Sequence, residues 1–331
     1  MSRVRFESDG QINGCRVLRL ESDLLRLDVL PECGGKIYRW LHKPENRDWL
    51  WQHPQIRPTV LPPGANFDDN FFGGWDEIFP SDCPCEHAGV TYPDHGEYWT
   101  QPCDWRAERT AESLTLYLRA EGNVTPTRME RWITLTAGSA AVRIRYRLSH
   151  LGQRAFEYLW KPHPALAVGP SCEIMIPATN GIIATPGCGR LATEPLPFTW
   201  PYVPGRDGNL HDFSKVPATA DIPDFEMVYL TELREGWWAV FDHSTRSGFG
   251  LAFDRRLFNN VWLFQSFGGW RGLHVVILEP CNAYPYDPAE ASLSGRIGRL
   301  EPGEIVQTGM TATVFTGVER AGDVRRVLNA V

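Results

Sequence analysis

The sequence has no apolar run long enough to cross a bilayer, for which about 18–20 consecutive apolar residues are needed. Its first ten residues, MSRVRFESDG, lack the apolar core of a secretory signal peptide. Basic residues are not in excess either, since 33 Lys and Arg against 40 Asp and Glu give a net charge of −7. We therefore expect no membrane partner, no nucleic-acid partner and a cytoplasmic location.

Motifs for cofactor and metal chemistry are also missing. The glycine pairs at 34–35, 73–74 and 268–269 lack the GxGxxG spacing and the following helix of a phosphate-binding loop, and no GxSxG or HExxH motif occurs. The eight cysteines are expected to be thiols, as in a cytoplasmic protein. A cluster of Cys83, Cys85, His87 and Cys103 has one-residue gaps that do not match structural zinc sites. We expect no metal and no cofactor.

The sequence does contain many turn residues and many aromatic side chains, with 30 Gly, 26 Pro and 13 Trp. Apolar residues alternate with polar ones in LLRLDVL (24–30), LTLYLRA (114–120), AVRIRYRL (141–148) and TATVF (311–315). This period of two predicts half-buried antiparallel strands. WWAVF (237–241) and LHVVILE (273–279) are continuously apolar, as expected of strands covered on both faces.

Strands without intervening helices predict an all-β fold, either a large antiparallel β-sandwich or a barrel. Only the C-terminal ERAGDVRRVLNAV has a weak helical pattern. Residues 54–82 and 177–224 are not strand-like, and the second segment holds eight prolines. Loops of this length are usually functional. Without a linker or repeat, we expect one domain over residues 1–331, carrying these two loops.

Aromatic and acidic side chains gather in GGWDEIFPSD (73–82) and in DHGEYW (94–99). A sugar site needs flat apolar surfaces for the C–H faces of the ring and polar groups that bond its hydroxyls. The residues that supply both kinds of group are Trp75, Asp76, Glu77, His95, Glu97 and Trp99. Solvated loop charge beside a few core-covering aromatics is the alternative interpretation.

Two further residues lie at positions that suit acid–base chemistry. His163 lies between two prolines in LWKPHPALAV (159–168), and proline indicates that a strand ends there. Glu279 closes the apolar strand at 273–279, where a carboxylate is either paired or has a raised pKa. A structural histidine and a buried salt bridge are the alternatives.

The order of four short motifs resembles the aldose 1-epimerase, or galactose mutarotase-like, superfamily. The motifs are HG at 95–96, HP at 163–164, LEP at 278–280 and LEPGE at 300–304. The resemblance extends from GGKIYRW (34–40) to LEPGEIVQTGMTATVF (300–315). It implies a large antiparallel β-sandwich, called a supersandwich, with a sugar site on the concave face of a sheet.

The resemblance also implies roles for three residues. Glu279 matches the general base that takes the proton from the anomeric hydroxyl, and His163 matches the histidine that protonates the ring oxygen. His95 matches a second histidine that bonds near the ring oxygen. Such a mechanism needs a free monosaccharide as substrate and no cofactor.

The sequence departs from the galactose-specific members, which carry an Arg and an Asn where this chain has FFGGWDEIFP. They also have an aromatic-Asn stretch in place of PALAV. We therefore expect a divergent branch in which Asp76, Glu77 and Gln265 recognise sugar hydroxyls. The acidic pair Asp76 and Glu77 disfavours a sugar phosphate.

Two alternatives to a mutarotase remain open. One is a carbohydrate-binding protein without catalysis, because a fold does not determine a function. The other is a lyase or a glycosidase, whose carboxyl pair would come from Glu77, Glu97 and Glu279.

Overall fold

The computed structural model describes residues 4–218 and 222–329. Its contacts divide the chain into two compact units. Unit 1 comprises residues 1–164 and 282–311, and unit 2 comprises residues 165–281 and 312–331. The expectation of one domain over the whole chain stays a prediction. In the described part of the chain, no helix combines the length and the apolar character needed to span a membrane.

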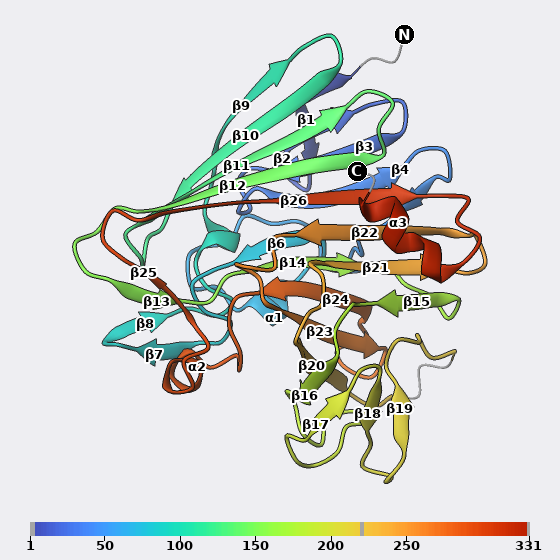
Figure 1. Ribbon diagram of the computed structural model, residues 1–331. Coiled ribbons are helices and arrows are strands. Elements are labelled where there is room, and N and C mark those ends of the chain that lie inside the picture. The colour runs from blue at the N-terminus through green and yellow to red at the C-terminus, as the bar shows by residue number, and fades with distance from the viewer. Residues whose placement is uncertain (1–3, 219–221, 330–331) are drawn as a thin grey trace. The chain divides into compact units, whose positions relative to one another are not determined.

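In unit 1, the 14-stranded antiparallel sheet contributes strands in the order β1-β2-β3-β4-β6-β14, and the 8-stranded sheet contributes β9-β10-β11-β12-β26. The pairs β13-β25 and β7-β8 form two small two-stranded sheets. Figure 1 shows β9–β12 as neighbouring long strands coloured teal to green. Two strands also extend into unit 2: β14 (Lys161–Leu166) beyond Pro164, and β26 (Ile305–Phe315) beyond Thr311. The other elements are β1 (Arg5–Ile12), β2 (Cys15–Glu21), β3 (Leu25–Leu30), β4 (Lys36–His42), β5 (Arg47–Asp48), α1 (Phe67–Asn70), β6 (Trp75–Ile78), β7 (Cys85–His87), β8 (Val90–Tyr92), η1 (Tyr98–Thr100), β9 (Asp104–Arg109), β10 (Ser113–Glu121), β11 (Thr127–Thr136), β12 (Ala141–His150), β13 (Phe156–Tyr158), α2 (Pro288–Leu293) and β25 (Gly298–Leu300).

Unit 2 contains the remaining strands of the two large sheets, in the orders β24-β23-β20-β16-β17-β18-β19 and β15-β21-β22-β26. The strands β21 and β24 are buried along nearly their whole length, as their continuously apolar sequences predict. The elements are β15 (Cys172–Met175), β16 (Asn180–Ile183), β17 (Pro197–Thr199), β18 (Tyr202–Pro204), β19 (Leu210–Asp212), β20 (Phe225–Thr231), β21 (Trp237–Asp242), β22 (Ser247–Phe253), β23 (Asn260–Phe267), β24 (His274–Cys281), η2 (Ala321–Asp323) and α3 (Val324–Asn329).

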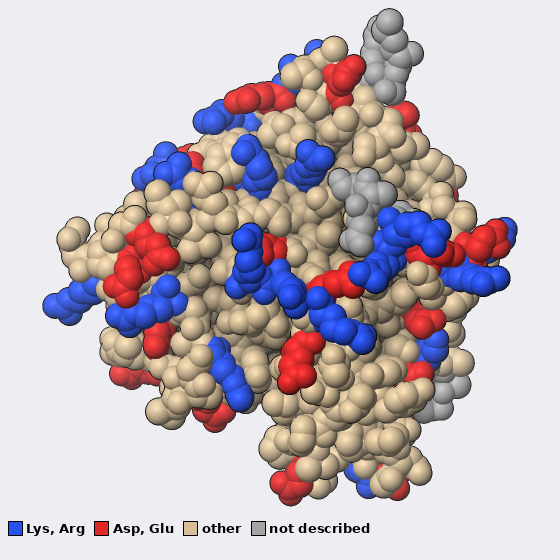
Figure 2. All heavy atoms as spheres, viewed as in Figure 1, with Lys and Arg blue, Asp and Glu red and all other residues tan. Residues whose placement is uncertain are grey.

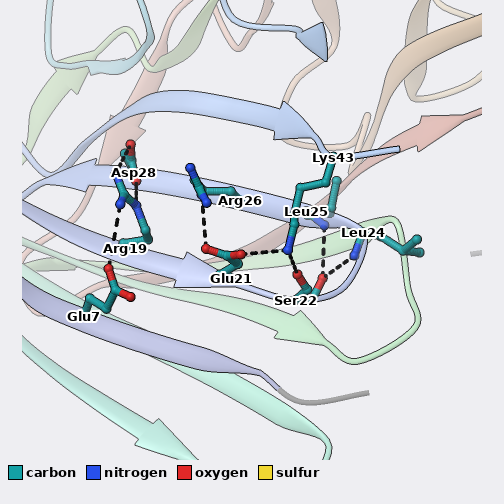
Figure 3. Close-up of polar contacts among 9 residues, drawn as sticks. All are labelled: Glu7, Arg19, Glu21, Ser22, Leu24, Leu25, Arg26, Asp28 and Lys43. Carbon is teal, nitrogen blue, oxygen red and sulfur yellow. Dashed lines mark hydrogen bonds and ion pairs between the residues drawn. The ribbon is translucent and has the colours of Figure 1, made fainter. Parts of the chain in front are cut away.

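Ion pairs fix the register at the first three strands of unit 1 (Figure 3). Arg19 and Asp28 are Cα partners across β2 and β3, and the Arg19 Nε donates to Asp28 at 2.7 Å. Glu21 and Arg26 face each other two residues along the strands, and Lys43 also donates to Glu21. A one-residue slip would separate both pairs as well as expose the apolar face.

The prediction of an all-β antiparallel sandwich is confirmed, and each of the six quoted strand patterns falls in a strand. The prediction that 177–224 is not strand-like is wrong, because β16–β19 lie within it. Proline is accepted there because Pro197 begins β17 and Pro204 ends β18. Likewise, β6 lies within residues 54–82. The weak helical pattern at the C-terminus forms η2 and α3.

Candidate functional site

A pair of histidines lies at the centre of the candidate site in unit 1. The ring centroids of His95 and His163 are 5.8 Å apart, and the ring planes are perpendicular. Phe67 of α1 stacks on His95 with 3.7 Å between centroids, and its ring is perpendicular to that of His163 at 5.5 Å. Phe71 makes a second edge contact with His163. Phe67 and the following Phe71 thus form an aromatic wall beside two histidines that are far apart in the sequence.

His95 lies in a tight turn that the surrounding backbone holds. Its φ is 54°, in the left-handed region that few residues other than glycine adopt. Its N–H donates to the Asp82 carbonyl at 2.8 Å. Gly96 also has a positive φ of 69°, and a Cβ at that position would collide with the backbone of Phe79. Backbone in such regions is found at functional sites more often than elsewhere.

Acidic side chains surround His95. Its Nδ1 lies 2.8 Å from Asp94 Oδ1, and its Nε2 lies 3.8 Å from Asp82 Oδ1. The Asp82 oxygen also pairs with the Lys161 ammonium at 2.6 Å. Lys161 lies two residues before His163 on β14, so both side chains point to the same face of the strand.

His163 is 3% exposed. Burial lowers the pKa of His163 well below its usual value, and the nearby charges of Lys161, His95 and Lys36 lower it further. The imidazole of His163 is therefore neutral at neutral pH. A neutral imidazole has one N–H donor and one acceptor nitrogen.

The alternation along β6 separates three residues that the sequence analysis grouped together. Asp76 is the Cα partner of His163 and shares its face, whereas Trp75 and Glu77 point to the opposite face. Asp76 pairs with Lys36 at 2.9 Å, and both side chains are at most 2% exposed. Burial raises the pKa of Asp76, and the Lys36 ammonium opposes that shift.

Glu77 lies between the two sheets of unit 1. Its carboxylate accepts hydrogen bonds from Tyr146 at 2.7 Å and Trp160 at 3.1 Å, and it pairs with Arg131. Trp75 is fully buried and stacks on Trp40. Both side chains therefore contribute to the interior of the unit.

Glu97 and Trp99 are also held inside unit 1. The Glu97 carboxylate accepts from the Val124 N–H at 2.6 Å and from the N–H and hydroxyl of Thr125. Trp99 is 5% exposed, and its Nε1 donates to the Asp94 carbonyl. These contacts anchor the turn that carries His95.

Glu279 lies in unit 2, near the end of β24, and is 1% exposed. It faces Trp262 of β23 in the register, so it shares a sheet face with Phe264, two residues along β23. Phe264 stacks on Phe225 with 5.4 Å between centroids, and both rings contact Trp270. The face that carries Glu279 is thus lined with aromatic rings.

Gln265 points to the opposite face of the same sheet. It lies across from Glu226 in the register and donates to the Glu226 carboxylate at 2.8 Å. Arg190 also donates two side-chain hydrogen bonds to the Glu226 carboxylate. Gln265 and Glu279, which the sequence analysis placed at the same site, therefore belong to different faces.

The cysteine cluster considered in the sequence is divided among different contacts. His87 pairs with Glu157 at 2.7 Å, and Cys103 lies next to Arg131, whose charge opposes the effect of burial on the Cys103 pKa. No group of three His, Cys, Asp or Glu side chains within residues 4–218 and 222–329 is arranged to hold a metal ion.

Phe67, Phe71, Phe225 and Phe264 were missed by the sequence analysis. Each is an aromatic residue of ordinary core type. Only the fold shows that two of them contact the histidine pair and that two share the Glu279 face.

No protein-family model and no curated protein sequence matches the chain. Solved structures do. A candidate aldose 1-epimerase from Klebsiella pneumoniae has a TM-score of 0.75 and 15% identity over 96% of this chain and 84% of that one. A galactose mutarotase related enzyme from Lactobacillus acidophilus has a TM-score of 0.61 and 13% identity over 92% and 99%. A galactose mutarotase-like protein from Lactobacillus casei has a TM-score of 0.58 and 14% identity over 90% and 100%.

At such identities the similarity establishes the fold alone. The chain has the galactose mutarotase-like β-sandwich fold, and the resemblance seen in the sequence is confirmed at that level.

Proposed function

We propose that this protein is an aldose 1-epimerase that interconverts the anomers of a free monosaccharide. The observation that supports this most is the histidine pair, in which His95 and His163 lie 5.8 Å apart against an aromatic wall. The shared fold adds support, because solved structures with this fold include proteins named as galactose mutarotase-like. The position of Glu279 on an aromatic sheet face supplies a candidate base.

The reaction is a pair of proton transfers around the anomeric carbon. As the ring opens, a base takes the proton from the C1 hydroxyl, the C1–O5 bond breaks and an acid protonates O5. Closure from the other side of the carbonyl reverses these steps and gives the other anomer. We assign Glu279 as the base, and the histidine pair supplies the proton. A positioned acid or base contributes about 10²–10⁴-fold each.

Contacts to the sugar are assigned from the faces of the strands. Asp76, oriented by Lys36, shares the face of His163 and is the candidate for hydroxyl recognition. Phe225 and Phe264 offer apolar surface for the C–H face of a sugar ring. For the residues held in the interior we propose structural roles in place of the sugar contacts expected from the sequence: Trp75, Glu77, Glu97, Trp99 and Gln265.

The substrate that we propose is uncharged. Several arginines of unit 2 already have acceptors within the protein: Arg190 binds Glu226 and Arg256 binds Asp254. Arg255 donates to the Leu233 carbonyl. In unit 1, the Lys36 and Lys161 ammonium groups are paired with Asp76 and Asp82.

Equilibration of a freshly dissolved pure anomer, followed by polarimetry or proton NMR, tests the proposal. A panel of neutral aldoses, uronic acids and sugar phosphates would be compared at equal enzyme concentration. We expect acceleration for at least one neutral aldose. Sugar binding without acceleration would instead support a binding protein, and cleavage of an oligosaccharide would support a lyase or a glycosidase.

A further inference from the structure

The carboxylate of Asp94 connects three parts of unit 1. Its Oδ1 lies 2.8 Å from His95 Nδ1, and its Oδ2 accepts the Phe67 N–H at 2.9 Å. The Asp94 carbonyl accepts the Trp99 Nε1–H at 3.0 Å. Asp94 thereby ties the first residue of α1 to the imidazole that stacks on it.

This arrangement determines which nitrogen of His95 is available. A carboxylate is an acceptor only, so the His95 nitrogen facing Asp94 is the one that carries a hydrogen. Nε2 is then the nitrogen that can take up or release a second proton. A carboxylate on the remote ring nitrogen selects the tautomer and stabilises the imidazolium that forms during a proton transfer.

The remaining neighbours of His95 are carboxylates, an aromatic ring and the second imidazole. Asp82, from the segment after β6, lies 3.8 Å from Nε2, and its charge is shared with Lys161 of β14. Phe67 lies parallel to the ring at 3.7 Å, and an aromatic face attracts a cation. Asp76 of β6 adds another carboxylate within electrostatic range, and His163 of β14 is the neighbouring imidazole.

The surroundings of His163 differ from those of His95. Its ring is buried, lies edge-on to Phe67 and Phe71, and is close to the positive charges of Lys161 and Lys36. Both burial and neighbouring cations disfavour an imidazolium at this position. The two histidines are therefore not equivalent.

We propose that Asp94 is a positioning residue that holds His95 with Nδ1 protonated, so that His95 donates the proton from Nε2 to the ring oxygen while His163 stays neutral. The chemistry of this step rests on the proposed function. The tautomer of His95 does not, because it can be measured without a sugar.

The test compares Asp94→Asn with the wild type in two measurements. An Asn side chain can still accept the Phe67 N–H through Oδ1 while its Nδ2 donates to His95 Nδ1, which forces the opposite tautomer. Nitrogen-15 NMR of the full-length protein, with His95 assigned through His95→Gln, should show Nδ1–H in the wild type and Nε2–H in Asp94→Asn. Asp104→Asn, which removes an exposed carboxylate of β9, is the matched control.

Kinetics provide the second measurement. We expect kcat for anomer equilibration to fall at least tenfold in Asp94→Asn with KM changed less than threefold. The alkaline limb of the kcat/KM profile should move to lower pH, because the Asn no longer neutralises the imidazolium. Asp94→Glu, which restores a carboxylate, should recover part of kcat, and Asp104→Asn should match the wild type.

Two results would overturn the inference: an Nε2–H tautomer of His95 in the wild type, or an unchanged kcat in folded Asp94→Asn. If Asp94→Asn does not fold, the wild-type tautomer and the kcat of Asp94→Glu decide. A wild type that equilibrates no sugar refutes the proposed function, while the NMR result still decides whether Asp94 fixes His95.

Discussion

Glu77 has a buried carboxylate, and its contribution to the stability of the fold depends on the groups that pair with it. It is 2% exposed and pairs with Arg131, which is equally buried. Removing one member of a buried ion pair leaves the other charge uncompensated, at a cost of about 3–5 kcal/mol. The Arg131 guanidinium also donates to the Gly34 and Gly35 carbonyls, so it cannot move out to water without breaking those bonds.

We predict that Glu77→Gln lowers the free energy of unfolding by about 3 kcal/mol. Urea denaturation monitored by tryptophan fluorescence would measure the loss. Glu121→Gln is the control, because Glu121 pairs with arginines at the surface, where solvent screens ion pairs and their loss changes stability little. If Glu77→Gln is as stable as the wild type but binds sugar more weakly, Glu77 contacts the sugar and its proposed structural role is wrong.

His163 connects the site to the pH dependence of stability. Its pKa is lowered in the folded protein, so below about pH 6.5 the unfolded chain takes up a proton that the folded chain does not. The contribution of a neutral His163 to stability is therefore complete above the unfolded pKa and declines as the pH falls toward the folded one.

We predict that the free energy of unfolding decreases below about pH 6.5, with His163 contributing a slope of up to about 1.4 kcal/mol per pH unit. In His163→Gln that part of the slope should be absent. Urea titrations at pH 7, 6 and 5 on both proteins would measure it. Equal slopes would show that His163 is not the responsible group.

At the scale of elements, the alternation of side chains along a strand decides which residues reach a candidate site. On β23, Phe264 shares the face of Glu279, and Gln265 points to the opposite face and Glu226. The same alternation on β6 places Asp76 beside His163 and sends Trp75 and Glu77 inward.

We predict that Phe264→Ala and Gln265→Leu have different effects. Phe264→Ala should raise KM for the sugar several-fold, because it removes apolar surface beside Glu279. Gln265→Leu should lower stability by about 1–3 kcal/mol, since it deprives the buried Glu226 of a donor. Anomer kinetics and urea denaturation on both variants distinguish the effects. A raised KM in Gln265→Leu alone would contradict the assignment of faces.

Some strands of the fold could be predicted from the sequence, and others could not. The strands 141–150 and 113–121 were predictable because their apolar residues alternate over many positions. Strand β6 was not, because WDEI has two carboxylates in a four-residue strand whose charges are satisfied by Lys36 and Arg131. Without that strand, the faces of residues 75–77 could not be assigned, and all three were grouped as sugar-binding.

Composition and the flanking prolines singled out His95 and His163 in the sequence, but the order of short motifs was what gave the two residues their roles. The sequence gives no information on the distance between these two side chains. Their proximity depends on the turn at 94–97 and on α1, which contributes the Phe67 ring. Asp94 was seen only as part of an acidic stretch, because its contact with Phe67 joins residues 27 positions apart.

At the scale of the whole molecule, charge is mixed rather than separated. On the face shown in Figure 2, Lys and Arg side chains lie among Asp and Glu side chains over much of the surface. On the outer face of the β9–β12 sheet, Arg147 pairs with Glu130 and Arg145 lies over Trp132. The net charge of −7 opposes the long-range attraction of a highly anionic ligand.

The central claim is that this fold, with Glu279 as base, catalyses equilibration of sugar anomers. The most direct measurement is the rate at which a pure anomer of a neutral aldose equilibrates with wild-type protein, with Glu279→Gln and with no protein. We predict clear acceleration by the wild type and a fall in the equilibration rate of at least about 10²-fold in Glu279→Gln. Circular dichroism should show that this variant keeps its fold. Equal rates for Glu279→Gln and the wild type would contradict the account.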